Sequence, residues 1–209
     1  MDYLKKILNK KKVIIFDLDG VLINSKDNMN ISWNYTSKKN KIKIPFSSYF
    51  NYIGLPFKEI LNCLKIKKNL IKIKKDYDKA SLKNLSKIRS YNKSRDVLES
   101  LKDNGKKIAL LTSKDTKRSK EVLKKLNFKF DYIECGKKNI KGKPDPHQLL
   151  LILKKLKIKR TNAVYVGDMR YDLLTAKNAK VDFIYATYGY GNIKFNNEKM
   201  IIKSISQLL

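Results

Sequence analysis

An aspartate pair, Asp17 and Asp19, follows the first apolar run of the chain. The run extends from Val13 to Phe16, and Gly20 comes directly after the pair. β-Branched and aromatic residues that stop at acids and a glycine indicate a buried strand that delivers its last side chains to a loop. If strand pairing continues, the two carboxylates lie on one face, because side chains alternate along a strand. Such a pair repels unless a cation lies between its members, and Mg²⁺ prefers oxygen ligands, water and phosphate.

A solvated strand-to-turn junction has the same Asp-x-Asp-Gly pattern, so the interpretation depends on three further segments. Each brings groups that handle phosphate or metal to the end of an apolar run or the start of a helical pattern. They are Thr112 with Ser113 after residues 108–111, Lys143 within residues 142–146, and Asp168 with Asp172 after residues 163–166. Phosphoryl transfer needs an in-line nucleophile, neutralised phosphoryl oxygens and a proton donor for the leaving alcohol. These residue types could supply all three.

The four segments together resemble the signatures of the haloacid dehalogenase superfamily, most closely its phosphoglycolate phosphatase-like branch with a small helical cap. The first signature corresponds to residues 17–22, and the others to Thr112, Lys143 and Asp168 with Asp172. The match extends from Val13 to the end of the chain. The resemblance implies an α/β fold with a Rossmann-like parallel sheet core and an inserted α-helical cap.

The expected site follows from the residue types together with this resemblance. We hypothesise that Asp17 attacks phosphorus and becomes an aspartyl-phosphate, while Asp19 protonates the leaving oxygen and later takes a proton from water. The expected substrate-binding residues are Gly20, Thr112, Ser113 and Lys143, the last of which offsets negative charge beside the nucleophile. The resemblance implies that Mg²⁺ is the cofactor. Its expected ligands are the Asp17 carboxylate, the Asp19 backbone carbonyl and the Asp168 carboxylate, with Asp172 acting through water or orienting the ligands.

The aspartate at position 19 narrows the reaction. Superfamily members that break carbon-halogen or carbon-phosphorus bonds lack an acid there, so the resemblance predicts a phosphoric monoester hydrolase. Its substrate would be a small phosphorylated metabolite, such as phosphoglycolate or a sugar phosphate. A sugar phosphomutase of the same family would carry the same residues and is the first alternative. A basic nucleic-acid-binding protein or polynucleotide phosphatase is the second.

The spacing between Asp19 and Thr112 predicts where an inserted domain lies. Roughly ninety residues separate them, far more than a crossover helix between neighbouring strands needs. The segment contains helical patterns, so we expect a helical cap over residues 25–89 and a core formed by residues 1–24 and 90–209. Between Thr112 and Lys143 there is room only for a helix, a loop and a strand at residues 131–134.

Local signals predict element ends within the core. Ser94 is expected to be the N-cap of a helix that runs to Asn104, with Gly105 beyond its end. Pro146 is expected at the first position of the helix that follows the loop with Lys143. In the segment from Tyr188 to Gly191, the glycines indicate a sharp turn rather than a contact. The loop at Gly54 is either a substrate-selecting loop or an ordinary helix entry.

The chain is strongly basic, with 48 Lys and Arg against 19 Asp and Glu and a formal net charge of +29. Such a charge is typical of proteins that bind nucleic acid or an anionic membrane surface. The lysines are spread along the chain, however, and no RNA-binding signature accompanies them. A coding bias toward A and T explains abundant Lys, Asn and Ile without a partner, and we favour that interpretation. Nucleic acid is not excluded as a partner, and the sequence does not determine the oligomeric state.

The remaining features favour a cytoplasmic protein. Cys63 and Cys135 lie in separate regions and form no metal-ligand pattern, which is typical of reduced thiols. Residues 1–12 lack an apolar segment long enough for export. The longest apolar runs have the length of strands, so we expect no membrane-spanning segment. The single histidine, His147, is not required by the expected chemistry.

Overall fold

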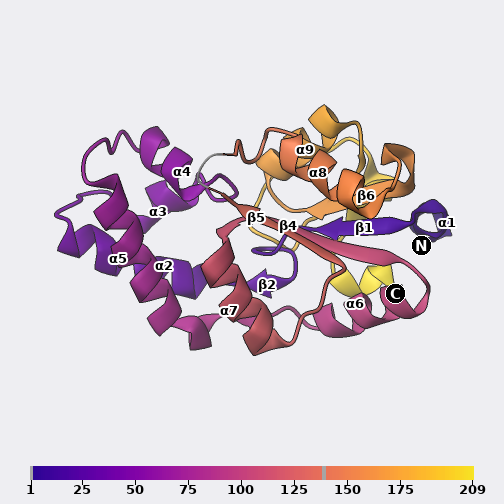
Figure 1. Ribbon diagram of the computed structural model, residues 1–209, viewed down its shortest axis with the longest axis horizontal. Coiled ribbons are helices and arrows are strands. Elements are labelled where there is room, and N and C mark those ends of the chain that lie inside the picture. Colours follow the sequence, from indigo (N-terminus) through magenta and orange to yellow (C-terminus); the bar gives the residue numbers. More distant parts are fainter. Residues whose placement is uncertain (1, 138–139) are drawn as a thin grey trace.

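The computed structural model describes residues 2–137 and 140–209 and contains a six-stranded parallel sheet (Figure 1). The strands follow the order β5-β4-β1-β6-β7-β8 across the sheet, and each neighbouring pair is parallel. Their bounds are β1 Val13–Phe16, β4 Lys107–Asp115, β5 Tyr132–Gly136, β6 Ala163–Gly167, β7 Asp182–Ala186 and β8 Ile201–Ile202. The predicted α/β fold class is therefore confirmed.

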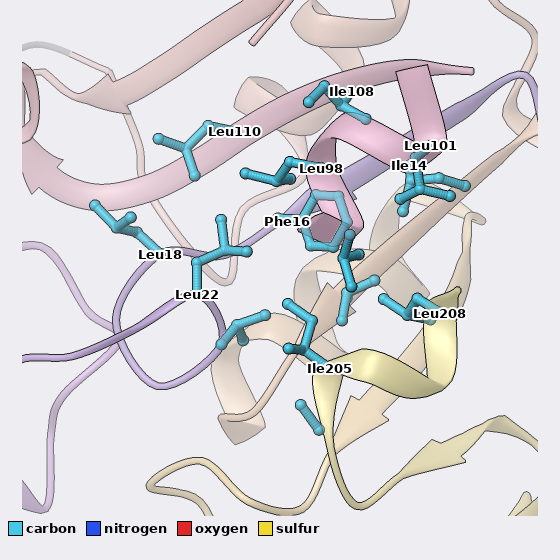
Figure 2. Packing of buried hydrophobic residues seen from close by; sticks show 14 of the residues in the cluster. Ile14, Phe16, Leu18, Leu22, Leu98, Leu101, Ile108, Leu110, Ile205 and Leu208 are labelled. Atoms are coloured by element: carbon cyan, nitrogen blue, oxygen red, sulfur yellow. The ribbon is translucent and has the colours of Figure 1, made fainter. Parts of the chain in front are cut away.

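The central strand β1 is buried on both faces, which explains why its sequence is uniformly apolar. Ile14 and Phe16 belong to one hydrophobic cluster, and Val13 and Ile15 belong to a second cluster on the opposite face. The first cluster includes residues of α1 (Asp2–Lys10), α6 (Ser94–Asp103) and α7 (Thr116–Leu126), and the second is covered by α8 (His147–Leu156) and α9 (Arg170–Ala179). Figure 2 shows Phe16 packed among Leu98 of α6, Leu22 and the C-terminal turn at Ile205. Both faces of the sheet are therefore covered by a hydrophobic core.

Four helices are inserted between the short strands β2 (Ile23–Asn24) and β3 (Arg89–Ser90), which pair antiparallel. They are α2 Lys26–Lys39, α3 Phe46–Phe50, α4 Phe57–Cys63 and α5 Leu70–Lys83, and we call them the helical insertion. Helical patterns at residues 31–35, 57–64 and 66–88 of the sequence overlap α2, α4 and α5, whereas the five-residue α3 is too short to give such a pattern. In Figure 1 the helical insertion lies beyond the ends of the strands, on the side of the sheet away from both termini.

The helical insertion has a hydrophobic cluster of its own, built around aromatic side chains. Trp33 stacks on Tyr49 at a centroid distance of 4.5 Å, and its Nε1 donates a hydrogen bond to the Ile44 carbonyl at 2.8 Å. This is the packing role expected of a buried tryptophan. Met169 and Tyr190, which come from the sheet side, pack against the same cluster. Residues that follow β6 and β7 therefore contact the hydrophobic cluster of the helical insertion.

Two predicted helix starts differ from the observed starts by one residue each. Ser94 is the first residue of α6 rather than its N-cap, and Lys93 occupies the cap position with a φ of 66°. The Ser94 hydroxyl donates to the Leu22 carbonyl at 3.0 Å, so a long-range contact uses the group that would have capped the helix. Pro146 is the N-cap, one residue before α8 begins, although its φ of −76° and ψ of −9° are already helical.

Two short 3₁₀ helices, Leu85–Lys87 and Arg160–Asn162, lead into strands, and two more, Glu198–Met200 and Ile205–Leu208, lie near the C-terminus. Strand β5 is shifted from the expected residues 131–134 and extends to Gly136. Every helix among residues 2–137 and 140–209 is too short or too polar to cross a membrane.

Candidate active site

The nucleophile candidate Asp17 follows β1 directly and remains bound to the sheet. Its amide donates to the Val166 carbonyl at 2.9 Å, and its side chain is almost fully buried. The Lys143 ammonium donates to Asp17 Oδ1 at 2.6 Å and to Asp172 Oδ1 at 2.7 Å. Three of the four segments singled out in the sequence therefore meet at one buried ammonium group.

Asp168, at the carboxyl end of β6, completes a cluster of three acids. Ligand oxygens of Asp17, Asp168 and Asp172 all lie within 4.8 Å of one another. Asp168 Oδ2 accepts a hydrogen bond from the Tyr190 amide at 2.6 Å, whereas its buried Oδ1 has no partner among the described residues. An unpaired buried carboxylate oxygen is costly unless a ligand satisfies it. The cluster is therefore suited to a cation.

The Asp168 side chain packs against two glycines, and any larger residue at either position would overlap it. A Cβ added to Gly20 would lie 2.1 Å from Asp168 Oδ2, and one added to Gly189 would lie 2.4 Å from the same oxygen. Gly20 also has a φ of 94°, a backbone conformation that strongly favours glycine. The chain turns at Gly189 as expected, and glycine is needed there for a second reason, because an added Cβ would meet the Asp168 side chain.

Burial and repulsion by neighbouring acids raise the pKa values of Asp17 and Asp168. Burial raises the pKa of Asp17 to about 7, with Lys143 opposing the shift and Asp172 adding to it. Burial also holds the pKa of Asp168 well above its ordinary value, and Asp172 and Asp17 reinforce that effect. Burial lowers the pKa of Lys143, but the adjacent Asp17 and Asp172 carboxylates raise it by more, so the ammonium stays charged. The acids thus require more positive charge than Lys143 supplies, and Mg²⁺, which binds carboxylate oxygens, fits that requirement.

Asp19 has a different set of partners from Asp17. Its Oδ1 accepts a hydrogen bond from the Ser25 hydroxyl and lies 3.1 Å from the Lys114 Nζ. Its carboxylate is not among the three acids whose ligand oxygens lie within 4.8 Å of one another, so the structure does not place the Asp17 and Asp19 carboxylates in one cluster. Their convergence depended on strand pairing that continues through both residues, and β1 ends at Phe16. The expected role of the Asp19 backbone carbonyl stays a prediction.

Thr112 and Ser113 lie within β4, beside the end of β1. Thr112 is buried, and its Oγ1 accepts a hydrogen bond from the Lys114 amide at 3.2 Å. The Ser113 hydroxyl donates to the Gly54 carbonyl at 2.6 Å, which ties β4 to the loop before α4. Gly54 has a φ of 99°, so a sharp turn brings that loop over the strand end.

A cavity of about 50 Å³ lies between the sheet edge and the helical insertion. Its sheet side is formed by five of the predicted site residues, namely Asp17, Asp19, Thr112, Ser113 and Lys143. Its other side is mainly apolar and aromatic, with Tyr49, Phe57 and Tyr77 among the side chains. The structure therefore brings these five predicted residues to one cavity, and Asp17 links it to Asp168 and Asp172.

Several residues at the site were missed by the sequence analysis. Lys114 and Arg118 line the cavity, but single cations give no pattern in a chain this rich in lysine. Ser25 and Tyr190 act through tertiary contacts, with the Ser25 amide donating to the Tyr190 hydroxyl at 2.7 Å. The Tyr188–Gly191 segment was noted only as a turn, whereas the Tyr190 amide binds Asp168. His147 is exposed and outside the cavity lining.

The comparisons with known proteins agree with this geometry. A model of the haloacid dehalogenase-like hydrolase family matches residues 14–186. A Caldanaerobacter subterraneus subsp. tengcongensis protein, provisionally named pyrophosphatase PpaX, is 34% identical over 82% of this chain and 80% of its own length. The phosphoglycolate phosphatase of Colwellia psychrerythraea is 27% identical over 88% of this chain and 87% of its own length.

Solved structures show the same fold. A Bacteroides fragilis protein, provisionally described as a haloacid dehalogenase-like hydrolase, superposes with a TM-score of 0.84 at 24% identity. The superposition covers 95% of this chain and 100% of that protein. The family model and the curated relatives span most of the chain, and they confirm the resemblance seen in the four sequence segments. The chain is therefore a hydrolase that belongs to the haloacid dehalogenase-like hydrolase family.

Proposed function

We propose that the protein is a Mg²⁺-dependent phosphatase that hydrolyses a small phosphate monoester through an aspartyl-phosphate on Asp17. The observation that carries this proposal is the arrangement around Asp17. A buried carboxylate at a strand end is bound by Lys143 and belongs to an acid cluster in which Asp168 has an unpaired oxygen. A nucleophile, a fixed positive charge and a cation site are thereby present within one small volume.

The chain's own residues account for both half-reactions. Asp17 Oδ2 or Oδ1 attacks phosphorus, the new oxygen-phosphorus bond forms, and the ester oxygen leaves with a proton from Asp19. A water molecule then gives a proton to Asp19 and attacks the aspartyl-phosphate, which releases phosphate and restores the Asp17 carboxylate. Both Asp17 and Asp19 line the cavity, as this sequence of steps requires.

The remaining site residues would bind the phosphoryl group and Mg²⁺ and neutralise the charge on the phosphoryl oxygens. Thr112 and the Ser113 amide are proposed to donate hydrogen bonds to phosphoryl oxygens, and Lys143 to offset the charge that develops on them; all three residues line the cavity. Asp17, Asp168 and Asp172 would hold Mg²⁺, directly or through water. When bound there, Mg²⁺ supplies charge stabilisation to the phosphoryl oxygens.

The size of the cavity supports a small substrate. A cavity needs about 10–15 Å³ to hold one water molecule, so about 50 Å³ leaves room for a few water-sized groups. We propose that residues 25–89 form a cap domain that closes over the site, with residues 1–24 and 90–209 as the core. The antiparallel β2-β3 pair at the junction and the separate hydrophobic cluster of the helical insertion support that division.

The decisive experiment measures phosphate release from p-nitrophenyl phosphate with and without MgCl₂, in the wild type and in Asp17→Asn. Asparagine keeps the shape of the side chain but cannot act as the nucleophile, so we expect a loss on the order of a thousandfold or more. Asp103→Asn, on an exposed position of α6, is the matched control and should retain activity. Full activity in Asp17→Asn would refute the proposal. Isomerised sugar phosphate without released phosphate would indicate a phosphomutase instead.

A further inference from the structure

Lys114 is a buried cation that the proposed chemistry does not yet use. It lies on β4, two residues after Thr112, and its side chain is only 4% exposed. Its Nζ lies 3.1 Å from Asp19 Oδ1, and this carboxylate is its one ion-pair partner among the described residues. An ammonium group has three donors, so Lys114 keeps hydrogen-bonding capacity on the side that lines the cavity.

The other two cations at the cavity each have two acidic partners. Lys143 donates to both Asp17 and Asp172. The Arg118 Nε donates to Asp115 at 2.6 Å and lies 3.1 Å from Asp78. Among the described residues, Lys114 is thus the cavity cation with the fewest acidic partners, and a buried ammonium gains from a further anion.

The position of Lys114 indicates which part of a substrate it would meet. Asp19 is the proposed proton donor to the ester oxygen, so that oxygen must come within about 3 Å of the Asp19 carboxylate. The Lys114 Nζ lies 3.1 Å from Oδ1 of that carboxylate. A leaving group within reach of Asp19 would therefore also lie close to the Lys114 ammonium, while the phosphoryl group on Asp17 would lie close to Lys143.

We propose that Lys114 determines specificity by binding a second anionic group of the substrate, a carboxylate or a further phosphate attached one or two atoms from the ester oxygen. This inference rests on the proposed function and deepens it. Hydrogen bonds between charged partners contribute more than neutral ones. A site built to bind an anion also discriminates against an analogue that lacks it, because the buried cation is then left without its partner.

Matched substrates test the inference in the wild-type enzyme first. Phosphoglycolate and 2-hydroxyethyl phosphate differ in a carboxylate, and phosphonomethyl phosphate and methyl phosphate differ in a phosphonate that stands in for a second phosphate; all four are monoesters. With Mg²⁺ present, we expect kcat/KM for at least one anionic member to exceed that of its neutral partner by about 10- to 100-fold, the effect of a hydrogen bond to a charged group. The pair that shows the larger ratio identifies the carboxylate or the phosphate as the preferred anion.

Three variants assign that preference to Lys114. Lys114→Met should reduce the ratio to near one, chiefly through a higher KM for the anionic substrate, whereas Lys114→Arg should retain most of it. Lys117→Met, an exposed position on α7, should leave the ratio and both rates at wild-type values. Thermal unfolding of each variant shows whether it is folded. The wild-type ratio needs no variant, so the inference remains testable if Lys114→Met does not fold.

Two results would overturn the inference. Equal kcat/KM within both substrate pairs in the wild type would show that no second anion is recognised. Equal losses on anionic and neutral substrates in Lys114→Met, with the ratio preserved, would show that Lys114 only positions Asp19. Absence of hydrolysis for all four substrates would instead refute the proposed function itself, and the inference with it.

Discussion

Lys143 is the residue that makes the buried acids at the site compatible with folding. One ammonium lies between Asp17 and Asp172, while Asp168 has an oxygen without a partner. Three carboxylates therefore share a single fixed positive charge. Burying unpaired charge costs several kcal/mol, so the folded protein favours proton uptake or cation binding at this cluster. Stability and cofactor binding are linked at the same residues.

This linkage predicts how Mg²⁺ changes stability with pH. The folded-state pKa of Asp17 is raised from 3.8 to about 7, so the protonated form is favoured by folding, and the free energy of unfolding falls as pH rises through that interval. Mg²⁺ binds the ionised carboxylates, and its stabilising effect should therefore be larger at pH 8 than at pH 5.5. Saturation at 100 times the Kd corresponds to about 2.7 kcal/mol.

Thermal unfolding with MgCl₂ or EDTA at the two pH values measures this effect. Sodium chloride of equal ionic strength controls for screening, and Asp168→Asn should lose most of the Mg²⁺-dependent shift in Tm. A shift of equal size at both pH values would contradict the assignment of the cation to the three acids.

The loop after β7 is the element that most closely controls the acid cluster. Its Tyr190 amide binds Asp168, the Tyr190 ring lies 5.3 Å from that of Phe50 in α3, and the Tyr190 hydroxyl accepts from the Ser25 amide. One residue thus contacts the cation site, the helical insertion and the junction that leads into it. Gly189 beside it permits the close approach of Asp168.

Gly189→Ala tests the importance of that close approach. The added Cβ would lie 2.4 Å from Asp168 Cβ and Oδ2, so the Asp168 side chain or the loop must move. We expect Mg²⁺ affinity to fall by about 10- to 100-fold, as for other changes that displace a metal ligand through its surroundings. Isothermal titration calorimetry measures this effect without relying on catalysis.

Gly105→Ala provides the contrasting control. Gly105 has a φ of 71°, and nothing lies within 4 Å of an added Cβ. Backbone strain should lower the free energy of unfolding by about 1 kcal/mol while Mg²⁺ affinity stays unchanged. Wild-type Mg²⁺ affinity in Gly189→Ala would show that the loop adjusts freely around Asp168.

The elements differ in how far their sequences predicted them. Strands β1 and β6 were predictable because uniformly apolar runs end at acids, and the positions of Asp17 and Asp168 followed from those ends. Helix α3 was missed because its five residues carry too little periodicity. Ser94 was misassigned because its hydroxyl binds the distant Leu22 carbonyl, a contact that no local pattern encodes.

The site shows the same division between local and tertiary information. Groups at strand ends were predicted correctly as neighbours, since parallel strands bring their carboxyl ends to one edge. Lys114 and Tyr190 were not assigned to the site, because the Lys114 ammonium meets Asp19 and the Tyr190 amide meets Asp168 only in the folded chain. The separation of the Asp19 carboxylate from the cluster was also hidden, because the sequence does not show that strand pairing ends at Phe16.

At the scale of the whole molecule, ion pairs connect the helical insertion to the core. Asp78 of α5 lies 3.1 Å from the Arg118 Nε of α7, and Lys74 of α5 lies 3.1 Å from Asp115. The Arg118 guanidinium is also placed over the Tyr77 ring at 5.1 Å. These contacts lie at the cavity, where they hold aromatic side chains of the helical insertion over the sheet edge. The shape of the cavity therefore depends on both the helical insertion and the sheet.

The net charge of +29 leads to the last prediction. Binding that rests on dispersed lysines is driven by release of counterions, and its affinity falls steeply with salt, by about 10³–10⁵ between 50 and 200 mM for six to ten phosphate contacts. We therefore expect fluorescence anisotropy to detect oligonucleotide binding at low salt and little binding at 150 mM KCl. Oligonucleotide should not inhibit hydrolysis of p-nitrophenyl phosphate at that salt, because the proposed site admits only small groups. Tight binding that persists at 150 mM KCl, with phosphate released from oligonucleotide ends, would favour a polynucleotide phosphatase.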